Sequence, residues 1–413
     1  METMLSKKSA QKSVKTIRDF DLSGKRVLIR VDFNVPLDKG LNVTDDTRIR
    51  ASLPTIQYAL DHGAKVVLMS HLGRPDGKPV SSMSLSPASK RLSELLKREV
   101  VQCSDCVGTR VKEELAPLNG TASVAVLENL RFHAAEEKND SAFAKQLAEN
   151  GDIYINDAFG SSHRAHASIE AITQFVPSGA GFLLEKEIQY LGDSMQHPKK
   201  PFVAILGGSK VSDKIGVVEN LIVKVDRILI GGAMAYTFLK VQGVEIGDSK
   251  FEKDKTELAK SILEKAKQHC VEILLPVDHV TVQKVDENAP SKVEGPSISG
   301  GRLGVDIGPK TVELFSKALD SAKTVIWNGP MGIFEMSAFS NGSRQIALKL
   351  SQLNGATTVI GGGDTAACVT GFGLDGKMSH ISTGGGASLE YLEGKTLPGI
   401  ACLPDRQAAP EKK

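Results

Sequence analysis

The sequence predicts an α/β protein in which parallel sheets carry helices on both faces. Short apolar segments alternate with longer amphipathic ones along the chain, which is typical of repeated strand–helix–strand units. Most of the apolar segments are rich in β-branched residues and nearly continuous in apolar character, as strands covered on both faces should be. At 413 residues the chain is too long for a single hydrophobic core, so two domains are expected.

Each expected element has its own local signal. Between the first two strands, a helix is expected to start at the capping residues 44–46 and to end at Gly63. The apolar residues of this helix, at helical spacing, are Ile49, Leu53, Ile56 and Leu60. The expected strands are Arg26–Phe33, Ala64–Met69, Ala122–Leu127, Asp152–Ile155, Pro201–Leu206, Val225–Ile230, Val271–Pro276, Lys323–Trp327 and Thr357–Ile360.

In the first half of the chain, charged and polar side chains follow the expected strands, where parallel sheets bind ligands. In the segment RVDFNVP, two-residue alternation puts Arg30, Asp32 and Asn34 on one face. Arg48 lies in the first turn of the following helix. Several guanidiniums at strand ends predict an anion site, because each grips a carboxylate or phosphate through two bonds. The other residues of this set are His71, Arg74, Arg131, His133, His163, Arg164 and His166.

In the second half, glycine follows the expected strands. Glycine lets backbone N–H groups come close to a ligand, and a helix amino terminus favours negative charge, so these loops predict a phosphate cradle. Asp364 adds a carboxylate able to hold Mg²⁺. The alternative is that the glycines only make tight strand-to-helix turns. The segments are LGGSK (206–210), IGGAMAYT (230–237), WNGPMG (327–332), IGGGDT (360–365) and ISTGGG (381–386).

Composition excludes several classes of protein. A formal net charge of +2 gives no sign of nucleic acid or an acidic membrane as a partner, and the apolar runs are too short for a membrane span. Five cysteines in so long a chain indicate a reducing compartment, and a cytoplasmic location is expected. Cys103 and Cys106 form a C-x-x-C, but no second pair completes a structural zinc site.

A series of segments resembles, in order, the motifs of the phosphoglycerate kinase family. The segments are RVDFNVP, SHLGRP, ENLRFH, NDAFGSSHRAHAS, LGGSKVSDK, WNGPMGIFE, GGGDTA and STGGGASLEYLEG. The resemblance implies two Rossmann-like domains facing across a hinged cleft. It implies a 3-phosphoglycerate domain over residues 1–186 and a nucleotide domain over 187–395. A tail, 396–413, would return to the first domain. The implied reaction moves the acyl phosphate of 1,3-bisphosphoglycerate to ADP, reversibly, with Mg²⁺.

The resemblance also implies a role for particular residues. It assigns the glycerate substrate to Asp32, Asn34, Arg48, His71, Arg74, Arg131 and Arg164. It assigns the nucleotide to Lys214, Gly304, Glu335, Gly362, Gly363, Asp364 and Thr365, with Asp364 next to Mg²⁺. It assigns stabilisation of the moving phosphoryl group to Arg48, Lys210, Gly384, Gly385 and Gly386.

Two other functions stay open from the sequence. Another carboxylate kinase would share the magnesium–nucleotide site but not the many arginines, and a non-catalytic nucleotide-binding protein would lack Lys210, Arg48 or Asp364. The segment Gly181–His197 is the expected hinge between the domains. A monomer is expected, with small-molecule substrates as its partners.

Overall fold

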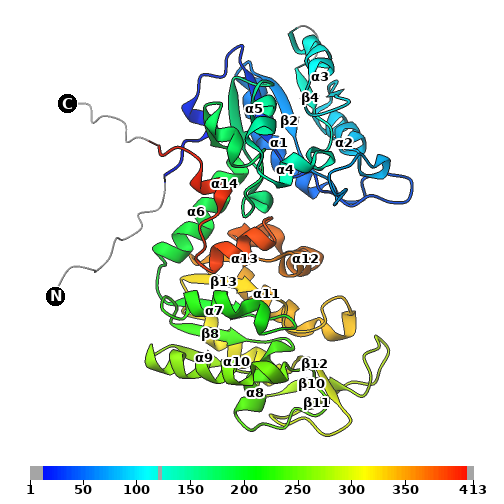
Figure 1. Cartoon of the computed structure of the whole chain (residues 1–413). Helices are drawn as coiled ribbons and strands as arrows, with labels where there is room; N and C mark the ends of the chain where they lie inside the picture. The colour runs from blue at the N-terminus through cyan, green and yellow to red at the C-terminus, as the bar shows by residue number, and fades with distance from the viewer. Residues whose placement is uncertain (1–12, 120–122, 407–413) are drawn as a thin grey trace, which may run out of the picture. The chain divides into compact units, whose positions relative to one another are not determined.

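The structure, a computed structural model, describes residues 13–119 and 123–406. Residues 190–395 form one compact unit, called the second unit, and the described residues on either side of them form the first unit. Each unit contains a six-stranded parallel sheet, which confirms the predicted α/β class. In Figure 1 the first unit begins in blue, and the second runs from green to orange. The first unit ends at Gln189, whereas the expected boundary was after residue 186.

The sheet of the first unit has the strand order β3-β4-β2-β1-β5-β6, and every pairing in it is parallel. Its carboxyl ends therefore share one edge. The strands are β1 Arg26–Arg30, β2 Lys65–Met69, β3 Val101–Gln102, β4 Val124–Val126, β5 Ile153–Asn156 and β6 Ser178–Ala180. The α-helices are α1 Thr47–Asp61, α2 Ser86–Leu96, α3 Thr109–Glu114, α4 Ala134–Glu137, α5 Ser141–Ala148, α6 Phe182–Gln196 and α14 Pro398–Ala401.

Alternate residues of these strands enter two separate hydrophobic clusters, so both faces of the sheet are covered. On β1, Val27 and Ile29 pack with residues of α1 and α2, whereas Leu28 packs with residues of α3 and α5. The cluster on the α1 side continues through Val31 and Phe33, as the alternation in the sequence predicts.

Several predicted boundaries differ from the structure, and hydrogen bonds explain two of the differences. The first strand ends at Arg30 rather than Phe33, because Phe33 N donates to the hydroxyl of Ser70, at 2.8 Å, and not to a neighbouring strand. The first helix starts at Thr47 rather than Thr44, because the Asp45 carboxylate accepts a hydrogen bond from Thr47 N at 2.9 Å. The expected strand Ala122–Leu127 is shorter as β4, and its residue 122 lies outside the described residues.

The second unit repeats the parallel arrangement, with the strand order β15-β14-β13-β7-β8-β9. One face of the sheet packs under α10, α11 and α12. The strands are β7 Phe202–Leu206, β8 Arg227–Ile230, β9 Glu272–Leu274, β13 Thr324–Asn328, β14 Thr357–Gly361 and β15 His380–Ile381. The α-helices are α7 Ile215–Leu221, α8 Met234–Val241, α9 Thr256–Gln268, α10 Pro309–Leu319, α11 Asn341–Ser351, α12 Gly363–Gly371 and α13 Gly386–Leu392.

A second, antiparallel sheet in this unit is not predicted by the sequence. It joins β10 (His279–Val282), β11 (Lys292–Glu294) and β12 (Leu303–Ile307) in the order β11-β10-β12. Its strands carry polar or charged residues, so they lack the continuous apolar character used to find the others. This sheet matters for the site, because β12 carries Gly304.

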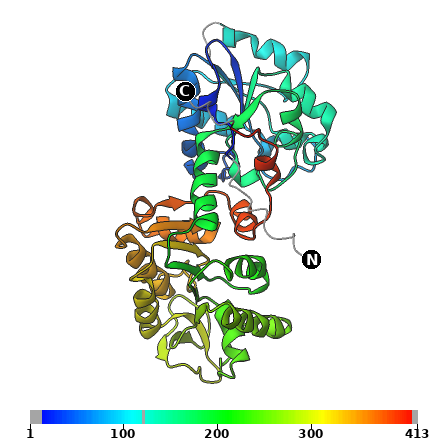
Figure 2. The ribbon, with the colours of Figure 1, turned by 90° about the vertical axis from the view of Figure 1, so that its left-hand side faces the viewer.

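Two further segments connect to the first unit. Helix α6, the continuous green helix of Figure 2, contains the point at which the chain leaves the first unit; its role as a hinge stays a prediction. Near the carboxyl end, α14 packs on the first unit, where Gly399 N donates to Ser162 O at 2.9 Å. Within 13–119 and 123–406, no helix has the length and apolar character needed to cross a membrane.

Candidate functional site

The predicted anion-binding residues of the first unit come from loops at one edge of its sheet. Strands β4, β2, β1 and β5 are consecutive neighbours, so the loops after their carboxyl ends are adjacent. Arg48 comes from the first turn of α1 instead. The residues that follow the four strands are Asp32 and Asn34 after β1, His71 and Arg74 after β2, Arg131 after β4 and Arg164 after β5.

Hydrogen bonds hold several of these side chains in place. The Asp32 carboxylate accepts a charge-assisted hydrogen bond from Arg48, at 2.6 Å. The backbone of Gly73 links two others, since its N–H donates to Asn34 Oδ1 and its carbonyl accepts from Arg131, both at 2.9 Å. Positioned groups of this kind bind an anion with little loss of side-chain freedom.

The exposed guanidiniums are Arg74 and Arg164. The side chain of Arg74 makes no hydrogen bond or ion pair with any other described residue, whereas Arg164 Nε lies 3.2 Å from His163 Nε2. Arg74 is therefore the cation of this set with the most freedom to turn toward a ligand.

The pKa values of two histidines show that several arginine charges lie close together. Burial, together with the charges of Arg30, Arg131 and Arg48, holds the pKa of His71 well below its usual range. Burial and Arg30 lower the pKa of His166 to about 3. Both imidazoles are therefore neutral at neutral pH, and an anion that partly neutralises the guanidiniums would relieve their mutual repulsion.

Arg30 is a further functional candidate. The sequence predicted only which face of the strand its side chain is on, and assigned it no role. It is 1% exposed, its Nε donates to Ser168 Oγ at 3.0 Å, and its Nη2 lies 3.2 Å from His71 Nδ1. The two-residue alternation that put Arg30 on the face of Asp32 and Asn34 was the signal that could have found it. A buried guanidinium behind His71 adds positive potential to this edge of the sheet.

The carboxyl edge of the second sheet is lined by glycine loops, and many of these glycines serve packing. A Cβ on Gly329 would lie 2.2 Å from Gly207 O, so the loops after β13 and β7 touch backbone to backbone. The presence of glycine at positions 207 and 329 is therefore explained by the tight backbone geometry alone, without a ligand. By contrast, a Cβ on Gly363 or Gly385 would meet nothing within 4 Å, so the backbone there is open on one side.

A pocket of about 530 Å³ lies at this edge of the second sheet. Its walls are partly apolar, with Val305, Met331 and Phe334, and partly polar, with Asp248 and Lys250. A pocket of this size, with apolar walls and a few polar groups, suits a small ligand with a flat apolar part. The predicted nucleotide-binding residues that line it are Gly304, Glu335 and Asp364.

Gly304 forms part of the pocket wall because it has no side chain. A Cβ there would lie 1.7 Å from the hydroxyl oxygen of Tyr236, a residue that is 4% exposed. Beside it, the buried carboxylate of Asp306 accepts hydrogen bonds from Gly342 N at 2.6 Å and from Ile307 N at 2.9 Å. Burial raises the pKa of Asp306 to about 7.

The remaining predicted nucleotide-binding residues lie next to the pocket, around β13 and α12. The ammonium of Lys214 donates to Asn328 Oδ1, and burial lowers the pKa of this lysine. Asp364, which is exposed in the first turn of α12, acts electrostatically on Lys214. Thr365 is buried, and its Oγ1 accepts a hydrogen bond from Gly329 N at 2.7 Å, so it fastens one loop to the next. Gly362 is the N-cap of α12, with φ +86°.

Asn328, at the end of β13, is a second candidate that the sequence analysis did not name. The residue is 1% exposed, and its amide nitrogen has no hydrogen-bond acceptor among the described residues. A Cβ on Gly362 would lie 3.2 Å from this nitrogen, so the donor is directed toward the loop before α12. A buried donor without an acceptor can bind a ligand or a water molecule that supplies one.

Apart from Arg48, which belongs to the first unit, the residues assigned to the moving phosphoryl group lie in two loops at the carboxyl edge of the second sheet. Lys210 follows β7, is exposed, and its side chain makes no hydrogen bond or ion pair with the described residues. Gly385 is the N-cap of α13, with φ +51°. The N–H of Gly384 already donates to Ser382 Oγ, at 3.2 Å, so the glycine triplet offers fewer free donors than expected.

Comparisons with known proteins agree on one family. The model of the family "Phosphoglycerate kinase" matches residues 17–395. Curated phosphoglycerate kinases are similar to this chain: that of Gloeothece citriformis is 56% identical over 399 residues, covering 96% of this chain and 99% of its own length. That of Koribacter versatilis is 56% identical over 400 residues, covering 95% and 99%.

Solved structures are similar as well. Phosphoglycerate kinase from Coxiella burnetii aligns with a TM-score of 0.85 at 39% identity, covering 94% of this chain and 98% of that one. Phosphoglycerate kinase from Pyrococcus horikoshii aligns with a TM-score of 0.80 at 32% identity, with the same coverages. The chain therefore belongs to the phosphoglycerate kinase family.

Proposed function

We propose that this protein transfers the acyl phosphate of 1,3-bisphosphoglycerate to ADP, giving 3-phosphoglycerate and ATP, and runs the reverse reaction. Family membership already makes it a kinase acting on small molecules. The observation that carries the finer proposal is the contrast between the two sheet edges: one presents guanidiniums, and the other presents glycine loops beside a pocket. The first suits a small polyanion and the second a nucleotide.

The first unit is the proposed 3-phosphoglycerate domain. Exposed Arg74 and Arg164 take the phosphate and carboxylate of the glycerate through paired hydrogen bonds. Asp32 and Asn34 accept hydrogen bonds from its hydroxyl and position Arg48 and Gly73. Neutral His71 and buried Arg131 complete the binding set, since they supply donors that are already ordered by the fold.

The second unit is the proposed nucleotide domain. The flat base lies against the wall at Gly304, where any side chain would intrude, and the Glu335 carboxylate accepts hydrogen bonds from the sugar hydroxyls. The phosphates lie by the loop 362–365, with Lys214 as the cation beside it. Asp364 fits Mg²⁺, because one exposed carboxylate next to phosphates is the usual protein contribution to such a site. When bound, Mg²⁺ supplies neutralisation of phosphate charge.

The chemistry asks the protein mainly to position groups and to neutralise charge. The phosphoryl group passes through a loose transition state that spreads negative charge over its oxygens. We assign Arg48, Lys210 and the free backbone donors of Gly385 and Gly386 to that charge. No general base is needed, because the accepting carboxylate or ADP phosphate is already ionised. A single donor of this kind is worth roughly a hundredfold or more in turnover.

A coupled assay with 3-phosphoglycerate, ATP and magnesium tests the function. The wild-type protein should turn over, Lys210→Ala should lose nearly all activity, and the exposed helix-surface variant Lys260→Ala should keep it. Turnover with another carboxylate but not with 3-phosphoglycerate would favour a different carboxylate kinase. Nucleotide binding without any turnover would favour a non-catalytic protein. We further propose a monomer in the cytoplasm; sedimentation and fractionation test these two points.

A further inference from the structure

A group of metal-ligand side chains lies at the carboxyl edge of β3 and β4. The sequence placed one of them, His133, in the predicted anion-binding set, but the structure brings it next to two residues outside that set. Asp105 and Cys106 follow β3, and His133 follows η4 (Leu130–Phe132), beyond β4. Because β3 and β4 are parallel neighbours, their loops meet. Glu128 N donates to Asp105 O at 3.2 Å, and the Cys106 thiol donates to Glu128 O at 2.9 Å. The sheet thus joins residues that are far apart in the sequence.

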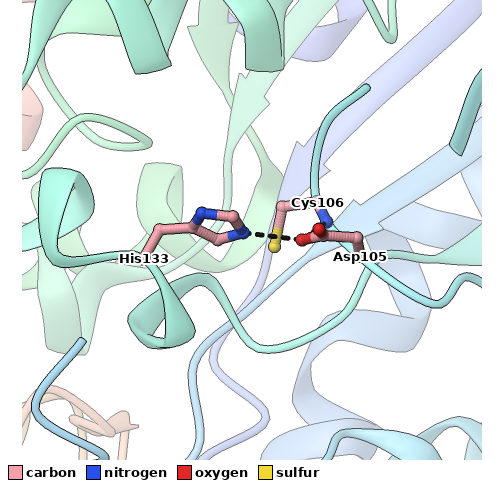
Figure 3. A group of neighbouring side chains, drawn as sticks. All are labelled: Asp105, Cys106 and His133. Carbon is pink, nitrogen blue, oxygen red and sulfur yellow. Dashed lines mark hydrogen bonds and ion pairs between the residues drawn. The ribbon is translucent and has the colours of Figure 1, made fainter. Parts of the chain in front are cut away.

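The geometry of this cluster is close to that of a metal site. One carboxylate oxygen of Asp105, the sulfur of Cys106 and one ring nitrogen of His133 all lie within 4.8 Å of one another. Figure 3 shows His133 reaching toward the other two, with its Nε2 2.6 Å from Asp105 Oδ1. Zinc bonds of about 2.0–2.3 Å separate ligand atoms in a tetrahedron by roughly 3–4 Å. Small side-chain shifts therefore suffice to enclose a cation.

We propose that Asp105, Cys106 and His133 bind a thiophilic divalent cation of the zinc type, with water in the fourth position. Thiolate and imidazole ligands favour zinc and cobalt, whereas magnesium prefers oxygen alone. As the metal binds, the thiol proton of Cys106 leaves to solvent, and its hydrogen bond to Glu128 O breaks. The Nε2 proton of His133 also leaves to solvent while Nδ1 takes one up, so the hydrogen bond to Asp105 breaks and one proton is released in all.

Access and orientation support this site. The side chains of His133 and Asp105 are 28% and 50% exposed, so a cation can reach them from solvent, while Cys106 is buried and closes the inner side. The ring of His133 is held by stacking on Phe143, with centroids 4.8 Å apart. A ligand whose orientation is fixed in advance loses less freedom when the metal binds.

The charge around the thiol also suits a cation. Asp105, Glu136 and Glu128 are the acidic groups that act on the Cys106 sulfur, so the local potential attracts a cation. Cys103 also acts on it but lies outside the cluster of ligand atoms. The site therefore arises from the pairing of β3 with β4, and not from the C-x-x-C spacing.

Cobalt(II) titration of the full-length protein, in a large excess of magnesium, tests the proposal. We expect one equivalent to produce the near-ultraviolet charge-transfer band of a cobalt–thiolate bond. Cys106→Ser should abolish the band. His133→Gln and Asp105→Asn should weaken cobalt binding by at least about tenfold, since even changes beyond the ligands typically cost 10–100-fold. Cys270→Ser, at the exposed cysteine, is the matched control and should keep the band.

The proposal fails if no such band forms at one equivalent. It also fails if the band survives in Cys106→Ser and disappears in Cys270→Ser, which would identify an adventitious surface thiol. Should the buried Cys106→Ser variant not fold, by circular dichroism, the two partly exposed variants decide: wild-type cobalt affinity in both would overturn the assignment.

Discussion

Replacing Gly304 by alanine should distort the proposed nucleotide pocket. The new Cβ would lie 1.7 Å from the Tyr236 hydroxyl oxygen and 2.4 Å from Cζ of the same ring. Ordinary contact is about 3.5 Å, so the ring or the strand β12 has to retreat by nearly 2 Å. Tyr236 is 4% exposed and lies against His279, with ring centroids 5.4 Å apart, so it has little space to move. Overpacking of this kind costs about 1–3 kcal/mol.

Two measurements follow from that magnitude. For a domain of this size, each 1 kcal/mol lowers Tm by roughly 2–4 °C, so thermal unfolding of Gly304→Ala should shift down by about 2–12 °C. Calorimetry should show ADP affinity falling by about tenfold or more, since 1.4 kcal/mol corresponds to a factor of ten. Affinity for 3-phosphoglycerate should not change, because Gly304 belongs to the second unit.

The control is Gly300→Ala on the same segment, where a Cβ meets nothing within 4 Å. A double-mutant cycle with Tyr236→Ala isolates the clash, since the combined variant should lose less stability than the sum of the single ones. Additive losses, or a Gly304→Ala protein with wild-type Tm and ADP affinity, would refute the idea that Tyr236 excludes a side chain at this position.

Three further predictions concern charge. Lys210→Ala should lower kcat roughly a hundredfold or more and leave nucleotide affinity nearly unchanged, because its charge acts mainly on the phosphoryl group in flight; a raised KM at near-normal kcat would argue for ground-state binding. In calorimetric titrations, Arg74→Ala should weaken 3-phosphoglycerate alone and Asp364→Asn the magnesium nucleotide alone, and equal losses of both ligands in either variant would contradict the two-site assignment. Burial raises the pKa of Asp306 from 3.8 to about 7, so its contribution to stability is full at low pH and is lost as pH rises through about 7. Urea unfolding should show this decline between about pH 4 and 7, and Asp306→Asn should flatten it; an unchanged slope in the variant would assign the decline to other groups.

The sequence predicted the parts of the fold that depend on continuous apolar segments. Strands such as β2 and β7 are buried on both faces, so burial alone selects their residues. The strands β10, β11 and β12 were missed because polar residues interrupt them; β11, for example, is Lys292–Glu294. What places them is backbone pairing among three consecutive segments of the chain, and the apolar character of single residues does not encode it.

The prediction of the site had a similar limit. Arg74 and Asp364 could be proposed from sequence, because each follows an expected strand and its side chain is exposed. Alternation along the strand put Arg30 on the face of the predicted site, but its burial and the histidine at 3.2 Å could not be predicted. The amide donor of Asn328, left without an acceptor, could not be predicted either. Such relations require the packed structure.

The two sheet edges also explain why the chain uses arginine in one unit and glycine in the other. In the first unit Arg74 and Arg164 are exposed on their loops, and Gly73 joins the side chains of Asn34 and Arg131 through its own N–H and C=O. In the second unit the loops pack on one another so closely that a Cβ on Gly207 would lie 2.2 Å from Pro330 O. Several glycines there are a condition for packing, whereas Gly208, Gly363 and Gly385 leave the backbone open on one side. It follows that alanine at Gly207 should lower stability, whereas alanine at Gly363 should weaken nucleotide binding without loss of Tm.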